Sequence, residues 1–227
     1  MESRHVGRAL EQAVIVPSGS TRDRPLLLLL HGRSSSPDSM ARASLVDAVE
    51  ELGERAPVIV LANGGDHSYY HDRAGGRWGS YVLEEVIPVA VRRYGLDPRR
   101  VAIGGFSMGG FGAFDLARFR GFCAVGGHSA ALWRTGGETP AGAFDHAEDF
   151  ARHDVLGAAR ANPRVYRRAE IWIDVGTSDP FRNAGTELAG LLPNVRFRLW
   201  RGGHDLAWFD DHAEEILSFY ADALEDC

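Results

Sequence analysis

The sequence predicts an α/β fold in which a mostly parallel central sheet is covered by helices on both faces. Six apolar runs of strand length alternate along the chain with stretches that carry apolar residues at helical spacing, which is the pattern of a parallel sheet with crossover helices. The runs are nearly continuous in Val, Ile and Leu, and this indicates strands buried on both faces. At 227 residues and 44% hydrophobic content, the chain suits one such domain, so we expect a single domain over residues 1–227.

The predicted strands and helices alternate along the chain. The strands are "LLLLLH" (26–31), "PVIVLA" (57–62), "RVAIGG" (100–105), "FCAVGG" (122–127), "EIWIDVG" (170–176) and "VRFRLW" (195–200). The helices are predicted over 39–55, 80–94, 108–119, 182–192 and 206–224. Within the second of these, Val82, Val86 and Val89 recur at helical spacing, and Gly95 is typical of a helix end.

The stretch from about 131 to 168 fits no strand. It is rich in Gly, Pro, Asp and His, which favours loops and short helical pieces. We therefore predict a short insertion over the active site, at the end of the sheet where the strands finish.

The charge and apolar patterns exclude two classes of partner. The net charge is −6 and acids and bases are interleaved, so there is no basic stripe for nucleic acid or for an anionic membrane surface. The longest apolar run, residues 26–30, is too short to span a bilayer. The first residues contain no apolar leader behind a basic start. We expect a cytoplasmic location.

The two cysteines predict no covalent framework. Cys123 lies in an apolar, strand-like run, and Cys227 is the last residue. We therefore expect neither a disulfide framework nor a cysteine-rich zinc site.

The stretch "GGFSMGG" places a serine between glycines directly after a predicted strand and before a predicted helix. Gly105, Ser107 and Gly109 form a Gly-x-Ser-x-Gly pattern, which is typical of a nucleophile elbow, a turn too sharp for flanking side chains. In a glycine-rich chain the pattern alone is weak evidence. A structural glycine turn is the alternative.

Two further functional groups follow strands in the order that this elbow requires. In open α/β sheets, ligands bind beyond the carboxyl ends of the strands, and Asp179 and His204 each follow one of the last two predicted strands. The order Ser, acid, His matches the nucleophile-elbow enzymes. We favour Asp179 as the acid, because Asp174 lies within a strand and Asp205 is adjacent to His204.

These residue types suit acyl transfer. A serine hydroxyl attacks an ester only when an imidazole accepts its proton, and a carboxylate holds that imidazole in the correct tautomer. The oxyanion that forms needs preorganised donors. We expect them to be the backbone amides of Met108, which follows the nucleophile, and of Arg33 in "HGRSSS" (31–36), with His31 as support for that loop.

The segments "LLLLLHGRS", "GGFSMGGFGAF", "GTSDPF" and "RGGHDLAWFDDHAEEILSFY" together resemble the α/β-hydrolase superfamily. Within it the chain is most similar to the esterases related to esterase D and the mycolyltransferases, from about residue 26 to residue 220. The resemblance implies that Ser107 is the nucleophile and His204 the base, with Asp179 as the looser match for the acid. It also implies hydrolysis of carboxylic esters or thioesters, with some members transferring the acyl group to a sugar, and no metal or organic cofactor.

Aromatic residues in loops are candidates for the pocket wall. Tyr69 and Tyr70 follow the second predicted strand, and Trp78, Trp133 and Phe181 also lie off the strands. Pocket residues are often aromatic, although most aromatic side chains pack in the core. We predict substrate contacts for these five residues and keep core packing as the alternative.

A metal site is a minor alternative in the stretch "GGDHSYYHD" (64–72). His67 and His71 lie beside aspartates there, but no further ligand cluster at zinc-like spacing occurs elsewhere. We expect no metal.

The sequence thus predicts a serine hydrolase that acts on a small-molecule ester or thioester through an acyl-enzyme. An acyltransferase that uses the same intermediate, and a binding protein on this fold, remain as alternatives. The acyl group, the leaving group and the oligomeric state are left open.

Overall fold

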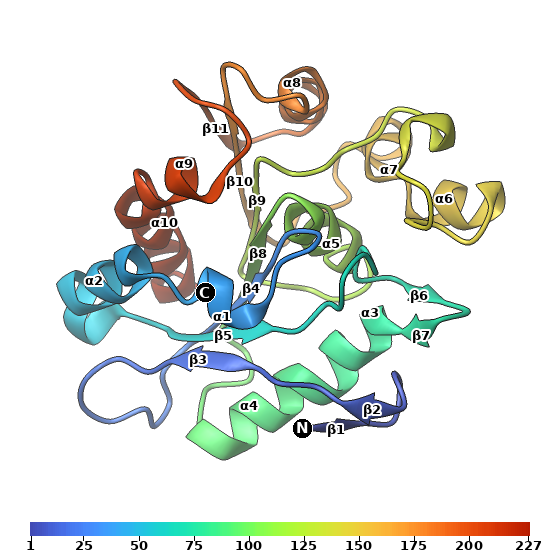
Figure 1. The fold of residues 1–227 in the computed structure, drawn as a ribbon. Coiled ribbons are helices and arrows are strands. Elements are labelled where there is room, and N and C mark those ends of the chain that lie inside the picture. Colours follow the sequence, from blue (N-terminus) through green and yellow to red (C-terminus); the bar gives the residue numbers. More distant parts are fainter.

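A seven-stranded sheet forms the centre of the computed structural model, which describes residues 1–227 (Figure 1). Across the sheet, the strands are β11 (Val195–Trp200), β10 (Glu170–Gly176), β9 (Ala124–His128), β8 (Val101–Phe106), β4 (Leu26–Leu30), β5 (Val58–Ala62) and β3 (Ala13–Ile15). Neighbouring strands are parallel except β3, which runs antiparallel to β5. The six predicted strands and the α/β fold class are confirmed.

The sheet separates two apolar cores. Along β4, Leu26, Leu28 and Leu30 face one core, while Leu27 and Leu29 face the other, and all five are fully buried. This alternation follows from the period-2 geometry of a strand. Apolar side chains on both faces therefore bury β4 between two layers of helices, as its continuous leucine run predicts.

Helices cover both faces of the sheet (Figure 1). One core packs against α3 (Trp78–Ser80), the π-helical turn η2 (Tyr81–Val86), α4 (Ile87–Tyr94), α5 (Met108–Leu116), α7 (Val155–Ala161) and α8 (Arg182–Leu191). The other core packs against α1 (Pro37–Met40), α2 (Ala43–Leu52), α9 (Leu206–Asp210) and α10 (Ala213–Glu225). The remaining helices are η1 (Gly53–Arg55), η3 (Gly136–Glu138) and α6 (Ala147–His153).

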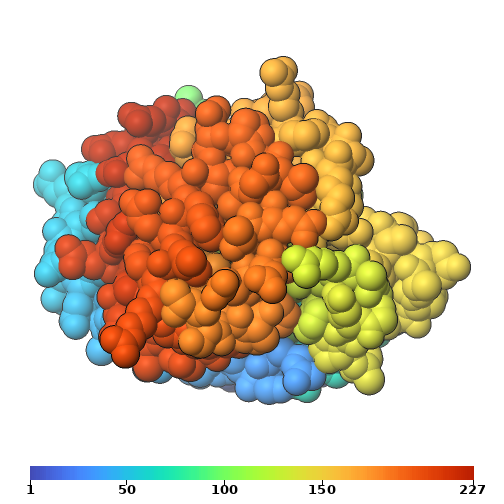
Figure 2. Space-filling model, turned by 90° about the horizontal axis from the view of Figure 1, so that it is seen from above, coloured from blue at the N-terminus to red at the C-terminus, as the bar shows by residue number.

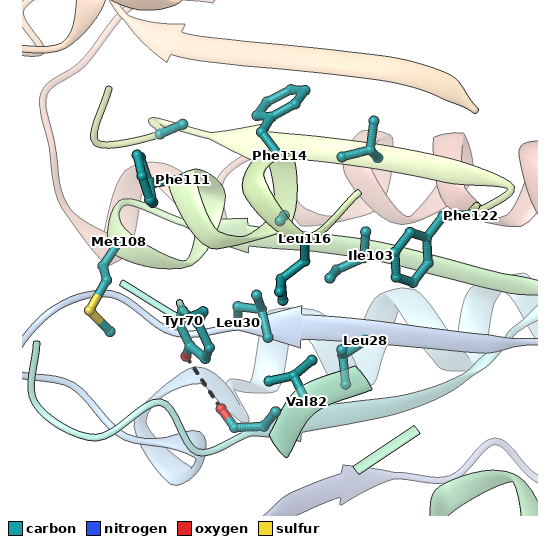
Figure 3. Close-up of a cluster of buried hydrophobic side chains, with 14 of the residues drawn as sticks. Leu28, Leu30, Tyr70, Val82, Ile103, Met108, Phe111, Phe114, Leu116 and Phe122 are labelled. Atoms are coloured by element: carbon teal, nitrogen blue, oxygen red, sulfur yellow. Dashed lines mark hydrogen bonds between the residues drawn. The ribbon is translucent and has the colours of Figure 1, made fainter. Parts of the chain in front are cut away.

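Figure 3 shows the first of these cores, where aromatic and aliphatic side chains from strands and helices meet. Phe111 and Phe114 of α5 lie over the sheet, and Leu28, Leu30 and Ile103 face them from β4 and β8. The helix that follows Ser107 is therefore anchored by apolar burial along its length, which holds its first turn in place.

Short strands and helix breaks were not predicted. The three-residue edge strand β3, the pair β1 (Glu2–Ser3) and β2 (Arg8–Ala9) and the pair β6 (Asp72–Arg73) and β7 (Gly76–Arg77) were missed. They are too short for a periodic pattern to be recognised. The predicted helices over 39–55 and 206–224 are each interrupted. In the second, α9 ends at Asp210 and α10 begins at Ala213.

The segment 131–168 contains short helices, as expected of an insertion. In Figure 2 it forms the yellow-green to yellow flank of the upper face, beside the orange residues that follow it. Its helix α7 packs against α5 and α8. α7 therefore lies beside neighbouring helices, and no residue of the segment lines the pocket described below.

The expectation of unpaired cysteines is wrong. Cys123, which directly precedes β9, forms a disulfide with Cys227, which follows α10, and their Cα atoms are 5.7 Å apart. The 104-residue separation hides this pairing in the sequence. In the chain-entropy model, a disulfide that closes a loop of that length stabilises the fold by about 4 to 5 kcal/mol.

None of the helices has the length and apolar content that crossing a membrane requires.

Candidate active site

Ser107 occupies a strained turn between β8 and α5. Its backbone has φ 56° and ψ −115°, a region that non-glycine residues rarely adopt. A Cβ atom on Gly105 would lie 2.5 Å from the backbone of Gly109, and one on Gly109 would overlap the backbone of Leu30. The flanking glycines are therefore needed because the elbow, α5 and β4 approach one another closely.

Three side chains from distant parts of the chain form a continuous hydrogen-bonded series. The Ser107 hydroxyl donates to His204 Nε2 at 2.8 Å, and His204 Nδ1 donates to Asp179 Oδ2 at 2.8 Å. A carboxylate only accepts hydrogen bonds, so the imidazole proton must be on Nδ1, and Nε2 is left free to accept the serine proton. The structure therefore brings the three predicted residues together in the arrangement of a triad.

The loops that carry the acid and the base are tied together by their backbones. Thr177 N donates to Trp200 O at 2.8 Å, and Ser178 N donates to Gly202 O at 2.8 Å. These bonds continue the pairing of β10 with β11 beyond the sheet. They hold Asp179 within reach of the His204 loop.

The Asp179 carboxylate is buried and has donors on both oxygens. Its side chain has no exposed surface. Phe181 N donates to Oδ1 at 2.6 Å, and the Ser129 hydroxyl donates to Oδ2 at 2.7 Å. Ser129 was missed by the sequence analysis, since no motif marks it and only its position after β9 relates it to the site.

The two competing aspartates have other partners. Asp174 is fully buried, where His128 Nδ1 lies 2.7 Å from its Oδ2 and Trp172 also donates to that oxygen. Asp205 accepts from Trp208 N at 2.8 Å and so caps α9. Neither aspartate is hydrogen-bonded to His204.

Two backbone amides near Ser107 are without an acceptor and are the predicted donors to an oxyanion. Met108 is the first residue of α5, so its N–H has no acceptor within the helix. Arg33 follows Gly32, which packs against Ser107, and the Arg33 N–H has no acceptor among the loop hydrogen bonds. Both predicted donors therefore border the nucleophile.

His31 holds the Arg33 loop to the loop after β5. Gly64 N donates to His31 Nε2 at 2.9 Å, which leaves the proton on Nδ1 to donate to Gly32 O at 2.8 Å. Burial lowers the pKa of His31, consistent with this neutral form. The ring supports the loop as predicted and has no need to touch a substrate.

A pocket of ≈ 610 Å³ opens at Ser107 and His204. Its wall is mainly polar and consists of Gly32, Arg33, Ser34, Ser35, Ser36, Ser39, Phe106, Ser107, His204, Asp205 and Leu206. The Arg33 side chain is exposed and makes none of the ion pairs found in the structure. None of the five predicted aromatic residues lines this pocket.

Of those five aromatic residues, Phe181 lies beside the base and Trp133 packs against Phe181. The ring of Phe181 is 5.2 Å from that of His204 and 4.8 Å from that of Trp133. Tyr69 packs against Phe111 and is 2% exposed, and burial raises its pKa. Phe181 and Trp133 thus form an aromatic pair next to His204, whereas Tyr69 packs in the core, and none of the three lines the polar pocket.

The other two predicted contacts are placed elsewhere. Tyr70 is fully buried, and its hydroxyl accepts from His31 N at 2.9 Å. Figure 3 shows its ring among apolar side chains of the core. Trp78 packs beneath the Arg8 guanidinium, 5.5 Å from the ring centre. Tyr70 is therefore a core residue, and Trp78 lies away from the pocket.

The histidines of the minor metal alternative have separate partners. His67 is half-exposed and lies 3.2 Å from Asp66, whereas His71 is buried and lies 3.1 Å from Asp149. No group of three or more His, Cys, Asp or Glu side chains is arranged to hold a metal ion. The two histidines therefore form no shared cluster.

A family model described as "Putative esterase" matches residues 3–214 of the chain. The chain belongs to this family. It is an α/β-hydrolase, as the sequence resemblance implied. A search of curated protein sequences found no match for this esterase-family chain.

Solved structures share this fold over nearly the whole chain. A ferulic acid esterase superposes with a TM-score of 0.85 at 22% identity, covering 98% of this chain and 96% of its own. An S-formylglutathione hydrolase from Agrobacterium tumefaciens gives a TM-score of 0.83 at 19% identity, covering 99% and 93%. FphF, a fluorophosphonate-binding serine hydrolase of Staphylococcus aureus, gives 0.78 at 22% identity, covering 97% and 96%. At identities of 19% to 22%, the structural similarity establishes a shared fold and no more.

Proposed function

We propose that this member of the esterase family is a serine hydrolase that cleaves a carboxylic ester or thioester through an acyl-enzyme. The observation that carries the proposal is the pair of 2.8 Å hydrogen bonds that join Ser107 to His204 and His204 to Asp179. Such a series lets a neutral imidazole remove the serine proton as the hydroxyl attacks a carbonyl carbon.

The first half of the reaction forms the acyl-enzyme. Ser107 Oγ bonds to the carbonyl carbon while its proton passes to His204 Nε2, and the carbonyl oxygen becomes an oxyanion. The amides of Met108 and Arg33 stabilise that charge. The bond to the leaving oxygen or sulfur then breaks, and His204 returns the proton to the leaving group.

The second half releases the acid. Water attacks the acyl carbon and gives a proton to His204 Nε2, and the ester bond to Ser107 breaks as its oxygen takes that proton back. Asp179 stays ionised throughout and stabilises the imidazolium. Every step uses groups of the chain and water, so the proposed mechanism requires neither a metal nor an organic cofactor.

The leaving group and the acceptor define the alternatives. Two structural neighbours are a ferulic acid esterase and an S-formylglutathione hydrolase, which supports a small-molecule ester or thioester as the substrate. An acyltransferase would use the same acyl-enzyme with an alcohol in place of water, and a binding protein would form no acyl-enzyme. The triad geometry favours the enzymatic alternatives.

The decisive experiment for this proposal is a burst measurement. Mixing the protein with excess p-nitrophenyl acetate is expected to release about one equivalent of p-nitrophenolate rapidly before a slower steady state, since the acyl-enzyme forms first. Parallel assays with an acyl thioester and with added glycerol separate hydrolysis from acyl transfer by their products. Absence of any acylation with either donor, in folded protein, would leave the binding alternative.

A cytoplasmic location is retained only as a prediction. The Cys123–Cys227 disulfide bears on that prediction. Disulfides persist mainly in oxidising compartments, so the disulfide weighs against this prediction. Fractionation of the cells that make the protein tests it.

We expect Phe181 to influence selectivity, because its ring lies 5.2 Å from that of His204. Phe181→Ala removes bulk beside the His204 ring, so the ratio of kcat/KM for a bulky to a small p-nitrophenyl ester should change about tenfold or more. The matched control is Phe119→Ala, since Phe119 is 63% exposed. Equal loss for all esters, with a lowered thermal midpoint, would instead mark Phe181 as a purely structural residue.

A further inference from the structure

Ser129 is hydrogen-bonded to Asp179, the acid of the triad. It follows β9, is completely buried, and donates its hydroxyl to Asp179 Oδ2 at 2.7 Å. That oxygen is the same one that accepts from His204 Nδ1 at 2.8 Å. A single carboxylate oxygen is thus shared by the base and by Ser129.

The backbone of Ser129 is held in an uncommon conformation. Its φ is 45°, in the left-handed region where glycine is favoured over residues with a side chain. Its N–H donates to Asp174 O at 2.9 Å, which attaches it to β10. The positive φ directs the Ser129 side chain differently from that of a residue in extended backbone. In this direction its hydroxyl reaches the Asp179 carboxylate.

The neighbours of Ser129 also hold the nucleophile. Ser107 N donates to His128 O at 2.9 Å, and Ala131 N donates to Ser107 O at 2.9 Å. The four residues 128–131 therefore contact the elbow through their backbone and the acid through the Ser129 side chain. This segment fixes the distance between the two ends of the triad.

The charge of Asp179 explains why the hydroxyl is needed. The buried carboxylate forms no ion pair with Lys or Arg, and its one ionisable partner is the His204 ring. A buried carboxylate requires donors in place of water. Phe181 N satisfies Oδ1 at 2.6 Å, while Oδ2 has only Ser129 and His204. Without Ser129, the carboxylate can turn away from the direction in which His204 needs it.

We propose that Ser129 is a positioning residue of the triad, which orients the Asp179 carboxylate toward His204 without contacting the substrate. The proposal deepens, and rests on, the serine hydrolase function proposed above. Ser129 acts through Asp179, so its removal should slow the activation of Ser107 while the elbow and the pocket remain formed.

The test compares three variants with the wild-type protein. Ser129→Ala removes the hydroxyl and keeps the backbone restriction, and Ser129→Gly removes the hydroxyl and relieves it. The matched control is Ser3→Ala, because Ser3 is also buried and donates to a carboxylate, Glu85 Oε2, at 2.6 Å. Two readouts are the rate of Ser107 labelling by a fluorophosphonate and the NMR resonance of the His204 Nδ1 proton, assigned by its loss in His204→Gln.

We expect both Ser129 variants to slow labelling roughly 10- to 100-fold, as is typical for loss of a hydrogen bond to a charged group. The Nδ1 proton should move upfield and broaden, because the carboxylate no longer holds a fixed direction. Ser3→Ala should change neither readout. The proposal is overturned if Ser129→Ala behaves like Ser3→Ala, or if Ser129→Gly restores the wild-type rate and resonance. The resonance needs no substrate, so it still decides on Ser129 if the wild-type protein hydrolyses no ester.

Discussion

Ser107→Ala is expected to lower the turnover of p-nitrophenyl acetate on the order of 10⁶-fold, as loss of a triad serine does in other hydrolases. Ser107 Oγ is the only triad atom that bonds to the acyl carbon in the proposed mechanism, so its removal leaves only the oxyanion donors and the pocket. Alanine retains the strained φ of 56° about as well as serine, so the fold should persist. Initial rates of the variant and the wild type, at equal concentrations of folded protein determined by absorbance, measure the effect.

A serine outside the pocket provides the control for this substitution. Ser68 is 5% exposed and its hydroxyl accepts from Tyr70 N at 3.0 Å. Ser68→Ala should lower stability slightly and leave turnover within a few-fold of the wild type. If Ser107→Ala kept substantial turnover in folded protein, another nucleophile would be responsible.

Asp179→Asn is expected to cut turnover roughly 10⁴-fold while the protein stays folded, by analogy with the serine-protease case. The present contacts all donate toward the carboxylate: Phe181 N to Oδ1, and Ser129 and His204 Nδ1 to Oδ2. An asparagine amide presents an NH₂ group to one of these positions, where it meets a donor. It therefore favours the imidazole tautomer with its proton on Nε2, which cannot accept from Ser107.

The control is Asp205→Asn, at the residue next to His204. Asp205 caps α9 through Trp208 N, and asparagine is an equally good helix cap. This variant should therefore keep turnover within a few-fold of the wild type. Near-normal turnover in Asp179→Asn, together with a large loss in Asp205→Asn, would show that the acid is wrongly assigned, although Ser107 and His204 would stand.

The sheet could be predicted because each of its six parallel strands is a nearly continuous apolar run. Leu26–Leu30 is completely buried between two cores, and five leucines between turn signals are a run of strand length that is too short for a typical helix. The antiparallel edge strand at Ala13–Ile15 was missed because three residues carry no recognisable period. Its position depends on pairing with β5, which only the folded chain shows.

The three triad residues could be predicted because a Gly-x-Ser-x-Gly pattern marks Ser107 and each of the three follows a predicted strand in the order Ser, acid, His. Ser129 could not be predicted from the sequence, because its contribution depends on a positive φ and on a hydrogen bond to a residue 50 positions away. Tyr70 was misplaced for a related reason. It lies in a loop, yet that loop turns inward and buries its ring completely. The disulfide joins residues 104 apart and needed the fold to bring them together.

The most direct test of the account is site-specific labelling by a fluorophosphonate. Only a serine activated by a base attacks phosphorus readily, and Ser107 alone donates to an imidazole that is held by a buried carboxylate. Intact mass spectrometry followed by peptide mapping should therefore find a single adduct, located on Ser107 and absent from Ser107→Ala. A label on a different serine, or no label on a protein that hydrolyses esters, would contradict the assignment of Ser107 as the nucleophile.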